Sequence, residues 1–371
     1  MAPTRRPGSP PALSIETAPA YELLHSIVVV IDSEDADTYD IGPAWTAEMR
    51  ERAGTELMER LAAISFGDCD TFRHLLGLAY DSPAPRDVPA FLGHLRETDP
   101  IELKLHLVQF YARDTRRMTP AATIRAAVAG DADARNEFLR TSHPDYEPWV
   151  AYLSAVLDAD ETWLKEEMVA VLEAWAERVW NPESPTILPI LDRDADAKRQ
   201  LQRDLPLDRF VTTATNGVEF APRPGLERVV MIPSFLQRPL VGHVEFGDAL
   251  IIVFPVADES VSADTDAPPL RLVRLSKALG DEKRLRILRV LAEGEKTLME
   301  LAETFGVAKT TMHHHMIVLR SAGLVTVGVG SKRYRLRHET VPDVGALLSG
   351  YLGAAPHPST APGKPAASSG R

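Results

Sequence analysis

The polar side chains between positions 309 and 314 have the types and spacing of a surface that binds nucleic acid. They are Lys309, Thr310, Thr311, His313 and His314. At about 100° per residue, Thr310 and His314 share one stripe of a helix. The opposite stripe is apolar and holds Met312, Met316 and Leu319. Hydroxyl and imidazole groups can hydrogen-bond base edges in a major groove about 12 Å wide, so the pattern predicts a recognition helix.

Basic side chains that follow this stretch extend the same hypothesis. Arg320 flanks the exposed stripe of the predicted helix, and Lys332 and Arg333 lie in a Gly-Ser-Lys-Arg turn. The turn separates segments 324–329 and 334–337, an arrangement typical of a β-hairpin. A basic hairpin tip can follow the phosphate backbone or enter a narrow minor groove, where negative potential favours arginine. The alternative is a solvated surface loop without a partner.

The helices that must position these side chains carry clear boundary signals. A helix over 272–279 precedes Asp281, which can cap the helix after it. Thr297 and Glu300 have the spacing of a capping box, which satisfies exposed amides at a helix start. Gly306 ends that helix, and the predicted recognition helix begins just after it. The order is helix, short glycine turn, helix.

Charge divides the chain into two parts. Residues 1–270 contain 25 Lys and Arg against 45 Asp and Glu, whereas residues 271–339 contain 14 against 7. The net charges are therefore −20 and +7, within a total of −12. Such asymmetry favours a nucleic-acid surface on the basic part, although an uneven solvated surface would give the same count.

Five short motifs follow one another in the basic part. They are Leu279-Gly280-Asp281, Arg284-Leu285-Arg286-Ile287-Leu288, Leu301-Ala302, His315, and Leu319-Arg320-Ser321-Ala322-Gly323-Leu324-Val325. With these motifs, segment 270–352 resembles the winged-helix domain of the ArsR-type, or arsenical-repressor-like, transcriptional regulators. The resemblance implies a homodimer that binds double-stranded DNA. It also implies that DNA is contacted by Lys309, Thr310, Thr311, His313 and His314, with the wing adding Lys332 and Arg333.

The residues that metal-sensing members of that family use are missing here. Those members carry paired cysteines on the helix that corresponds to 298–302, and the one cysteine of this chain is Cys69. Other members place Asp and His ligands on a C-terminal helix, where this chain has Asp343 and no histidine. The histidines 313–315 point about 100° apart and cannot converge on one ion. We expect no metal and no other cofactor.

A last helix over 342–352 has an apolar face that suits dimer packing. The residues predicted to form the dimer interface are Leu272, Leu275, Leu347, Leu348 and Tyr351.

The acidic part is predicted to be mainly helical and closed by a small antiparallel sheet. Its clearest helix spans 161–180 and is expected to stop at Asn181-Pro182. Further helices are predicted over 45–64, 89–96, 101–113 and 120–129, the last with Thr119 as N-cap. Strands are predicted over 211–215, 218–220, 228–232, 243–246 and 249–254. The fold class is mainly α (α+β).

Trp163 and Trp175 are candidates to line a pocket for a flat, apolar effector, although tryptophans at helical spacing more often form core. The chain has no glycine-rich phosphate loop, no G-x-S-x-G and no H-E-x-x-H, and we expect no enzyme. An enzyme or ligand-binding domain fused to a winged helix is one alternative. A winged helix used for protein association is another.

The expected organisation follows from these patterns. The predicted boundaries are a disordered start over 1–12, an acidic helical domain over 13–256, a linker over 257–269, a winged-helix domain over 270–352 and a disordered tail over 353–371. With no apolar run long enough to span a membrane, the sequence predicts a cytoplasmic bacterial regulator. We expect a homodimeric repressor that binds pseudo-palindromic operators and responds to an unknown small-molecule effector.

Overall fold

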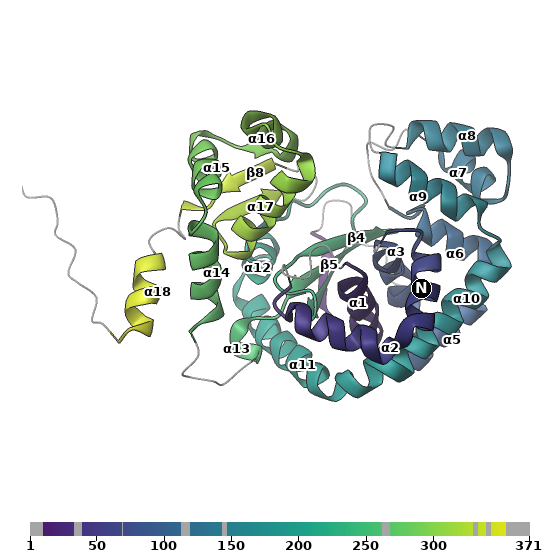
Figure 1. Cartoon of the computed structure of the whole chain (residues 1–371), viewed down its shortest axis with the longest axis horizontal. Helices are drawn as coiled ribbons and strands as arrows, with labels where there is room; N and C mark the ends of the chain where they lie inside the picture. Colours follow the sequence, from purple (N-terminus) through teal and green to yellow (C-terminus); the bar gives the residue numbers. More distant parts are fainter. Residues whose placement is uncertain are drawn as a thin grey trace, which may run out of the picture. The chain divides into compact units, whose positions relative to one another are not determined.

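The computed structural model describes residues 10–32, 39–68, 70–112, 119–142, 147–261, 268–328, 333–338 and 343–353. The chain divides into two compact units, and the division falls between Ser262 and Ala263 (Figure 1). Each unit has its own buried apolar cluster.

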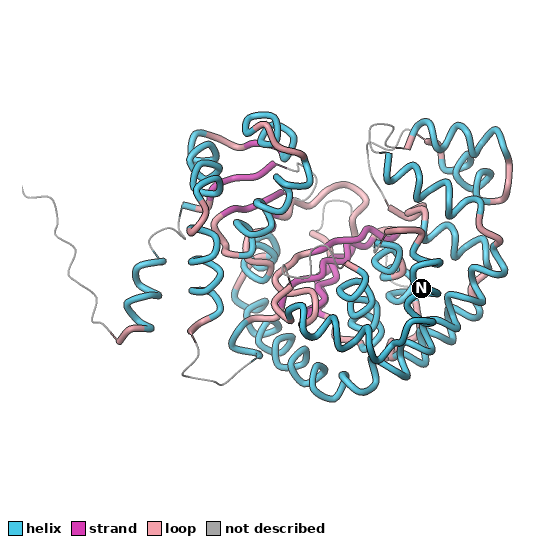
Figure 2. The backbone as a smooth tube through the Cα atoms, viewed as in Figure 1, coloured by secondary structure: helices cyan, strands magenta, loops and turns pink. Residues whose placement is uncertain are grey.

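Helices make up most of the first unit, and a small sheet lies among them (Figure 2). The helices are α1 (Pro19–Ile31), α2 (Gly42–Ser65), α3 (Asp70–His74), α4 (Leu76–Asp81), α5 (Val88–Glu97), α6 (Pro100–Leu107), α7 (Ala121–Val128), α8 (Ala132–Thr141), α9 (Glu147–Asp158), α10 (Glu161–Trp175), a π-helical turn (Ala176–Trp180), α11 (Asn181–Asp204), α12 (Leu207–Ala214) and α13 (Asp258–Val261).

The sheet of the first unit is mixed, so the predicted antiparallel sheet is wrong. Its strand order is β1 (Ala12–Ile15), β3 (Arg228–Ser234), β5 (Ala249–Pro255) and β4 (Gly242–Phe246). β1 pairs parallel with β3, and β3 pairs parallel with β5. The strands predicted over 243–246 and 249–254 correspond to β4 and β5, which pair antiparallel. A further strand, β2, has two residues (Val218–Glu219). The sequence pattern missed β1, which begins where we expected disorder to end.

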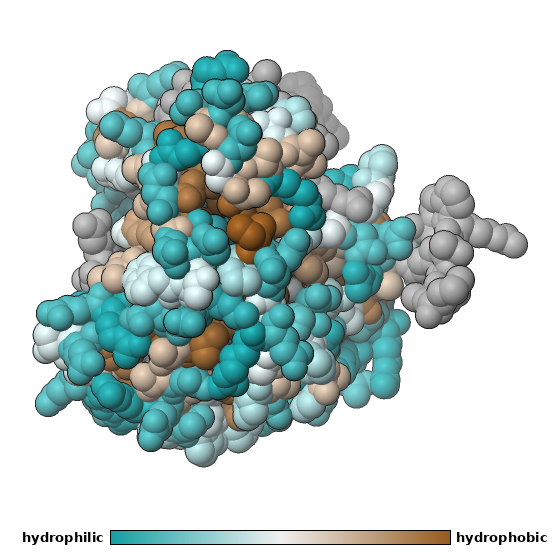
Figure 3. All heavy atoms as spheres, turned by 90° about the vertical axis from the view of Figure 1, so that its right-hand side faces the viewer, coloured by the Kyte–Doolittle hydropathy of each residue, from teal (hydrophilic) through white to brown (hydrophobic). Residues whose placement is uncertain are grey.

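Helix α1 forms the centre of the first unit and was also missed by the sequence pattern (Figure 1). Its apolar run from Ile27 to Val30 is completely buried. A helix that is apolar on nearly all sides is stable only inside a protein, which explains why other helices surround it. The outer surface differs from this apolar interior. The face shown in Figure 3 is covered mainly by hydrophilic residues, with small apolar areas between them.

Asn181-Pro182 does not stop the predicted helix, which is a second correction. α10, the π-helical turn and α11 follow one another without a gap. Pro182 lies in the first turn of α11, directly after the π-helical turn. A π-helical turn holds one extra residue and lets the two helices join.

Three other predicted elements differ from the structure. Segment 211–215, predicted as a strand, lies largely in α12, where Phe210, Val211 and Ala214 are buried on one helical face. Tertiary packing overrides β-branched propensity there. α6 ends at Leu107 instead of continuing to 113. The N-cap of α7 is Pro120, whereas the Thr119 hydroxyl lies 2.5 Å from the Thr141 hydroxyl.

The second unit contains five helices and three strands within its described residues. They are α14 (Leu270–Leu279), α15 (Glu282–Glu293), β6 (Lys296–Thr297), α16 (Leu298–Phe305), α17 (Lys309–Ser321), β7 (Val325–Gly328), β8 (Arg333–Leu336) and α18 (Asp343–Tyr351). β8 pairs antiparallel with both β6 and β7. The core of this unit includes Leu275, Ile287, Leu291, Leu301, Met312, Met316, Leu319 and Val325.

The predicted boundary signals of this unit are confirmed. The Asp281 side chain accepts the Arg284 amide and caps α15. Thr297 and Glu300 form the complete capping box of α16. Gly306 ends α16 in the left-handed conformation, with φ 60°, which glycine adopts at little cost. The Arg284 guanidinium adds a link, because its Nε donates 3.0 Å to the Ala278 carbonyl at the end of α14.

Candidate nucleic-acid interface

Helix α17 has one buried side and one exposed polar side. Met312, Met316 and Leu319 are at most 1% exposed and pack into the core of the second unit. The exposed residues of its N-terminal half are Lys309, Thr310, Thr311, His313 and His314. The structure therefore places all five predicted contact residues on the solvent side of one helix.

The start of α17 is held by the turn that follows α16. Val307 donates its amide to the Ala302 carbonyl at 3.1 Å, and Gly306 donates to the Glu303 carbonyl at 3.2 Å. The N-cap of α17 is Ala308, which has no side-chain acceptor for the first-turn amides. A helix N-terminus of this kind favours an anion, such as a backbone phosphate.

Two basic groups of α17 lie away from the exposed polar side. His315 is half-buried, and burial lowers the pKa of its imidazole although Asp281 raises it. Arg320 is also half-buried, and burial lowers the pKa of its guanidinium, which lies close enough to Tyr334 for electrostatic interaction. Arg320 was predicted to flank the DNA-facing stripe. Its interaction with Tyr334 places the guanidinium near strand β8.

Two cations of the hairpin were predicted to contact DNA, Lys332 and Arg333. Lys332 lies outside the described residues. Arg333 donates from Nη2 to the Glu295 carbonyl at 3.2 Å and forms ion pairs with the side chains of Glu295 (3.7 Å) and Glu300 (3.5 Å). The amide and hydroxyl of Thr297 lower the pKa of Glu300, and Arg333 lowers it further. The sequence pattern did not indicate these acidic partners.

The predicted dimer residues differ in how far they are buried within one chain. Leu275 is 0% exposed and belongs to the core of its own unit, and Leu272 is also buried. Within one chain, neither of these two side chains offers an exposed surface for the predicted dimer contact. Leu347 is partly buried against the core. Leu348 and Tyr351 on α18 are 46% and 44% exposed, so they remain candidates for a contact between copies.

The tryptophans proposed to line an effector pocket do not share one environment, which corrects that prediction. Trp163 is 44% exposed on the surface of α10. Trp175 is completely buried, and its indole Nε1 donates 2.8 Å to the Ser26 hydroxyl on α1. Trp175 therefore belongs to the core.

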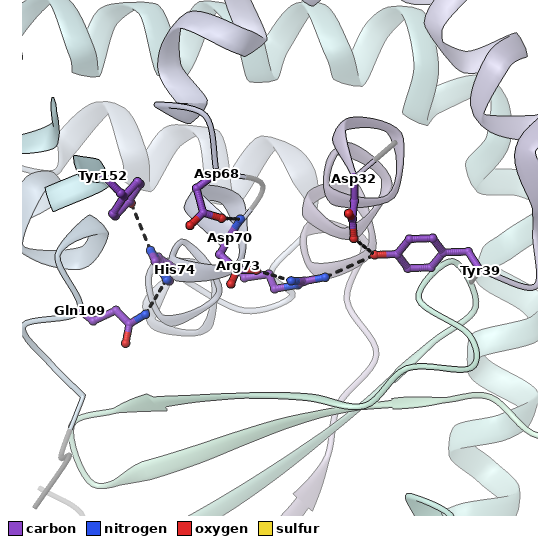
Figure 4. A network of polar contacts seen from close by, with 8 residues as sticks. All are labelled: Asp32, Tyr39, Asp68, Asp70, Arg73, His74, Gln109 and Tyr152. Carbon is purple, nitrogen blue, oxygen red and sulfur yellow. Dashed lines mark hydrogen bonds and ion pairs between the residues drawn. The ribbon is translucent and has the colours of Figure 1, made fainter. Parts of the chain in front are cut away.

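The first unit contains a buried polar network (Figure 4). His74 lies between the Tyr152 hydroxyl, 3.2 Å from Nδ1, and the Gln109 amide, 2.6 Å from Nε2. Burial lowers the pKa of His74 to about 4, so its ring is neutral near pH 7. Tyr152 donates to the Leu107 carbonyl at 3.1 Å. The network joins three segments of the fold by hydrogen bonds.

A second part of this network is charged. The Tyr39 hydroxyl donates 2.6 Å to Asp32, and Arg73 contacts both Tyr39 and Asp70 (Figure 4). Across the described residues, no group of three His, Cys, Asp or Glu side chains could hold a metal ion. Cys69 lies outside those residues. Nor does the described part of the chain include a helix that is both apolar and long enough to cross a membrane.

Comparison with known proteins defines the class of the second unit. Residues 279–328 match a family described as a helix-turn-helix domain. The matched segment runs from the last residue of α14 to the last residue of β7 and so contains the α16–Gly306–α17 turn. The second unit thus carries a helix-turn-helix domain followed by a β-hairpin, the winged arrangement.

Part of the chain is also similar in sequence to one individual protein. Over 80 residues, the chain is 35% identical to the HTH-type transcriptional regulator Rv0324 of Mycobacterium tuberculosis. The aligned region is 21% of this chain and 35% of that protein, so the chain spans about a third of its relative's length. No solved structure matches the chain.

Proposed function

We propose that this chain is a transcriptional regulator of the ArsR type that binds specific DNA sites through α17. The observation that carries the proposal is the exposed polar side of α17, with Lys309, Thr310, Thr311, His313 and His314. Side chains of these types at the N-terminal end of a helix can hydrogen-bond base edges and hold phosphates in a major groove. The helix-turn-helix match and the likeness to a transcriptional regulator support the same function.

Charge supports a DNA partner for the second unit. Segment 271–339 has a net charge of +7, and residues 1–270 have −20. Positive charge favours association with the phosphate backbone, whereas the acidic part is repelled by it. The second unit is then the part that contacts DNA, and the first unit is the part that receives a signal, with a small-molecule effector as its proposed source.

The proposed regulator binds as a homodimer and represses at a pseudo-palindromic operator. Half-sites for two helix-turn-helix copies lie about 10 bp apart or a multiple of that distance. Leu348 and Tyr351 are exposed on α18 and can be buried by a second copy. This pair now carries the dimer proposal, since Leu272 and Leu275 are buried within one chain.

Selection from random-sequence DNA tests this function. The full chain is mixed with random duplexes, bound duplexes are recovered and sequenced, and the recovered site is footprinted. Thr310→Ala should change the preferred base at one position of each half-site and cost about 1–3 kcal/mol in binding to the selected duplex. Thr304→Ala is the matched control, because Thr304 is exposed on α16 and donates back to the Glu300 carbonyl.

The control variant should keep the wild-type site and affinity. Failure to enrich any sequence at low salt would reject the proposed function. A site without two-fold symmetry would reject the homodimer. If Thr310→Ala and Thr304→Ala behaved alike, α17 would not be the helix that reads the bases.

A further inference from the structure

Two arginines of the wing strand β8 bind the same acidic residue. Arg335 donates from Nε to Glu295 Oε1 at 2.9 Å, and its Nη2 contacts the same oxygen. Arg333 lies 3.7 Å from Glu295 Oε2 and donates 3.2 Å to the Glu295 carbonyl. Glu295 is therefore shared between two cations that stand two residues apart on one strand.

The same set of contacts reaches the first helix of the helix-turn-helix. Arg333 Nη2 lies 3.5 Å from Glu300 Oε2. That oxygen also accepts the Thr297 amide at 2.6 Å, within the capping box of α16. Side chains of the wing and the start of α16 thus belong to one chain of polar contacts, from Arg335 through Glu295 and Arg333 to Glu300.

The backbone connection beside these contacts is short. β6 and β8 are joined over two residue pairs, Lys296 with Tyr334 and Thr297 with Arg333. Leu336 anchors the far end of β8 in the core. This ladder spans two residue pairs, and the side-chain contacts of Glu295 add to it in holding β8 beside the start of α16.

We infer that Glu295 is a positioning residue that fixes the DNA-contacting wing by binding Arg333 and Arg335. The inference rests on the proposed DNA-binding function and refines it. It assigns Arg333 to the support of the wing and leaves phosphate contact to other wing cations, with Lys332 next in sequence as the first candidate. Glu295 itself need not touch DNA.

Charge alone predicts the opposite outcome. An acidic side chain in a DNA-binding unit repels phosphate, so its removal should strengthen binding. If Glu295 positions the wing, its removal weakens binding although the net charge becomes more positive. Glu293 offers a matched control, because it is an exposed acidic residue at the end of α15, two positions away.

The experiment compares Glu295→Ala with Glu293→Ala in the full chain. Binding is measured to the duplex recovered by selection, and amide hydrogen exchange is measured over 333–336. We expect Glu295→Ala to weaken binding about fivefold and to speed exchange, whereas Glu293→Ala leaves both unchanged or binds slightly tighter. Glu295→Gln keeps an acceptor for arginine and should fall between the wild type and Glu295→Ala.

A double variant adds a test of the pair itself. Glu295→Ala with Arg335→Gln should weaken binding less than the sum of the two single changes, because both remove the same contact. Equal binding by Glu295→Ala and Glu293→Ala, with equal exchange, would overturn the inference. If the wild type bound no DNA, the proposed function would fail, and exchange over 333–336 would still report whether Glu295 holds the strand.

Discussion

The two units use polar side chains in opposite ways. The first unit buries many of them, including Glu22, His25, His74, Lys104, His106, Asp194 and Arg238. In the described part of the second unit, Thr326 is the one polar side chain that is buried. The second unit therefore leaves its other described polar side chains at least partly exposed. The first unit uses many of its polar side chains for hydrogen bonds that connect different segments of its interior.

The buried groups of the first unit have specific partners. Glu22 Oε1 accepts the amides of Phe235 and Leu236, each at 2.8 Å. Lys104 donates 3.1 Å to the Leu157 carbonyl, and burial lowers the pKa of its amine. A buried polar group stabilises a fold only while its partner is in place, so changes inside this unit should be costly.

Tryptophan fluorescence can follow one unit alone. All five tryptophans lie between positions 45 and 180, and the second unit has none. Trp175→Ala removes a completely buried ring and the hydrogen bond to Ser26, and should lower the free energy of unfolding of the first unit by about 3–5 kcal/mol. Urea titration followed by the remaining tryptophans measures this loss.

Trp163→Ala is the control for that variant. Its ring is 44% exposed, and the free energy of unfolding should change by no more than about 0.5 kcal/mol. DNA binding by the second unit at low denaturant should survive both changes if the units fold separately. Equal losses from the two variants would show that Trp175 is not core.

Acid should weaken the first unit through its buried imidazoles. Burial lowers the pKa of both His74 and His106 to about 4. The unfolded chain binds these protons near pH 6.5, so the free energy of unfolding falls as pH drops from about 6.5 toward 4. The loss is about 2 kcal/mol per histidine by pH 5. Urea titrations at several pH values, followed by tryptophan fluorescence, measure it.

His106→Phe isolates one of the two contributions. The His106 ring stacks on Phe246 with centroids 5.4 Å apart, so phenylalanine keeps the aromatic contact and removes the titrating group. The variant should lose about half of the pH dependence between pH 6.5 and 5. An unchanged slope would mean that His106 is not the group that titrates.

A smaller effect than those of Trp175 and the buried histidines is expected in the second unit. Thr297→Ala removes the N-cap of α16 and should cost about 1 kcal/mol, measured as faster amide exchange in 298–305. Tryptophan fluorescence should not change. Exchange as slow as in the wild type would show that Glu300 alone caps the helix.

Local signals explain why the second unit was predictable from sequence. The Thr297 and Glu300 capping box, Gly306 and Asp281 each act within a few residues, and the structure has all of them in place. The exposed polar side of α17 also followed from helical spacing. The partners of Arg333 did not, because Glu295 lies 38 residues earlier in the chain.

The first unit was less predictable because its sheet depends on distant segments. β1 was missed because its backbone hydrogen bonds depend on pairing with a distant segment, as when Ala12 pairs with Arg228. The parallel direction of β1, β3 and β5 has no signature in any one strand. Segment 211–215 was predicted as a strand from its β-branched residues. The burial of Phe210 and Ala214 on one face favours a helix there instead.

The pairing of β1 with β3 also orders events during synthesis on the ribosome. Ala12 to Ile15 emerge early, but their partners from Arg228 to Met231 are added only after nearly all of the first unit. Until then the apolar segment Ile27–Val30, which is completely buried in the folded unit, has no complete hydrophobic core to pack into. A nascent chain of this design depends on the helices made in between, or on a chaperone, to shield that stretch from neighbouring polypeptides.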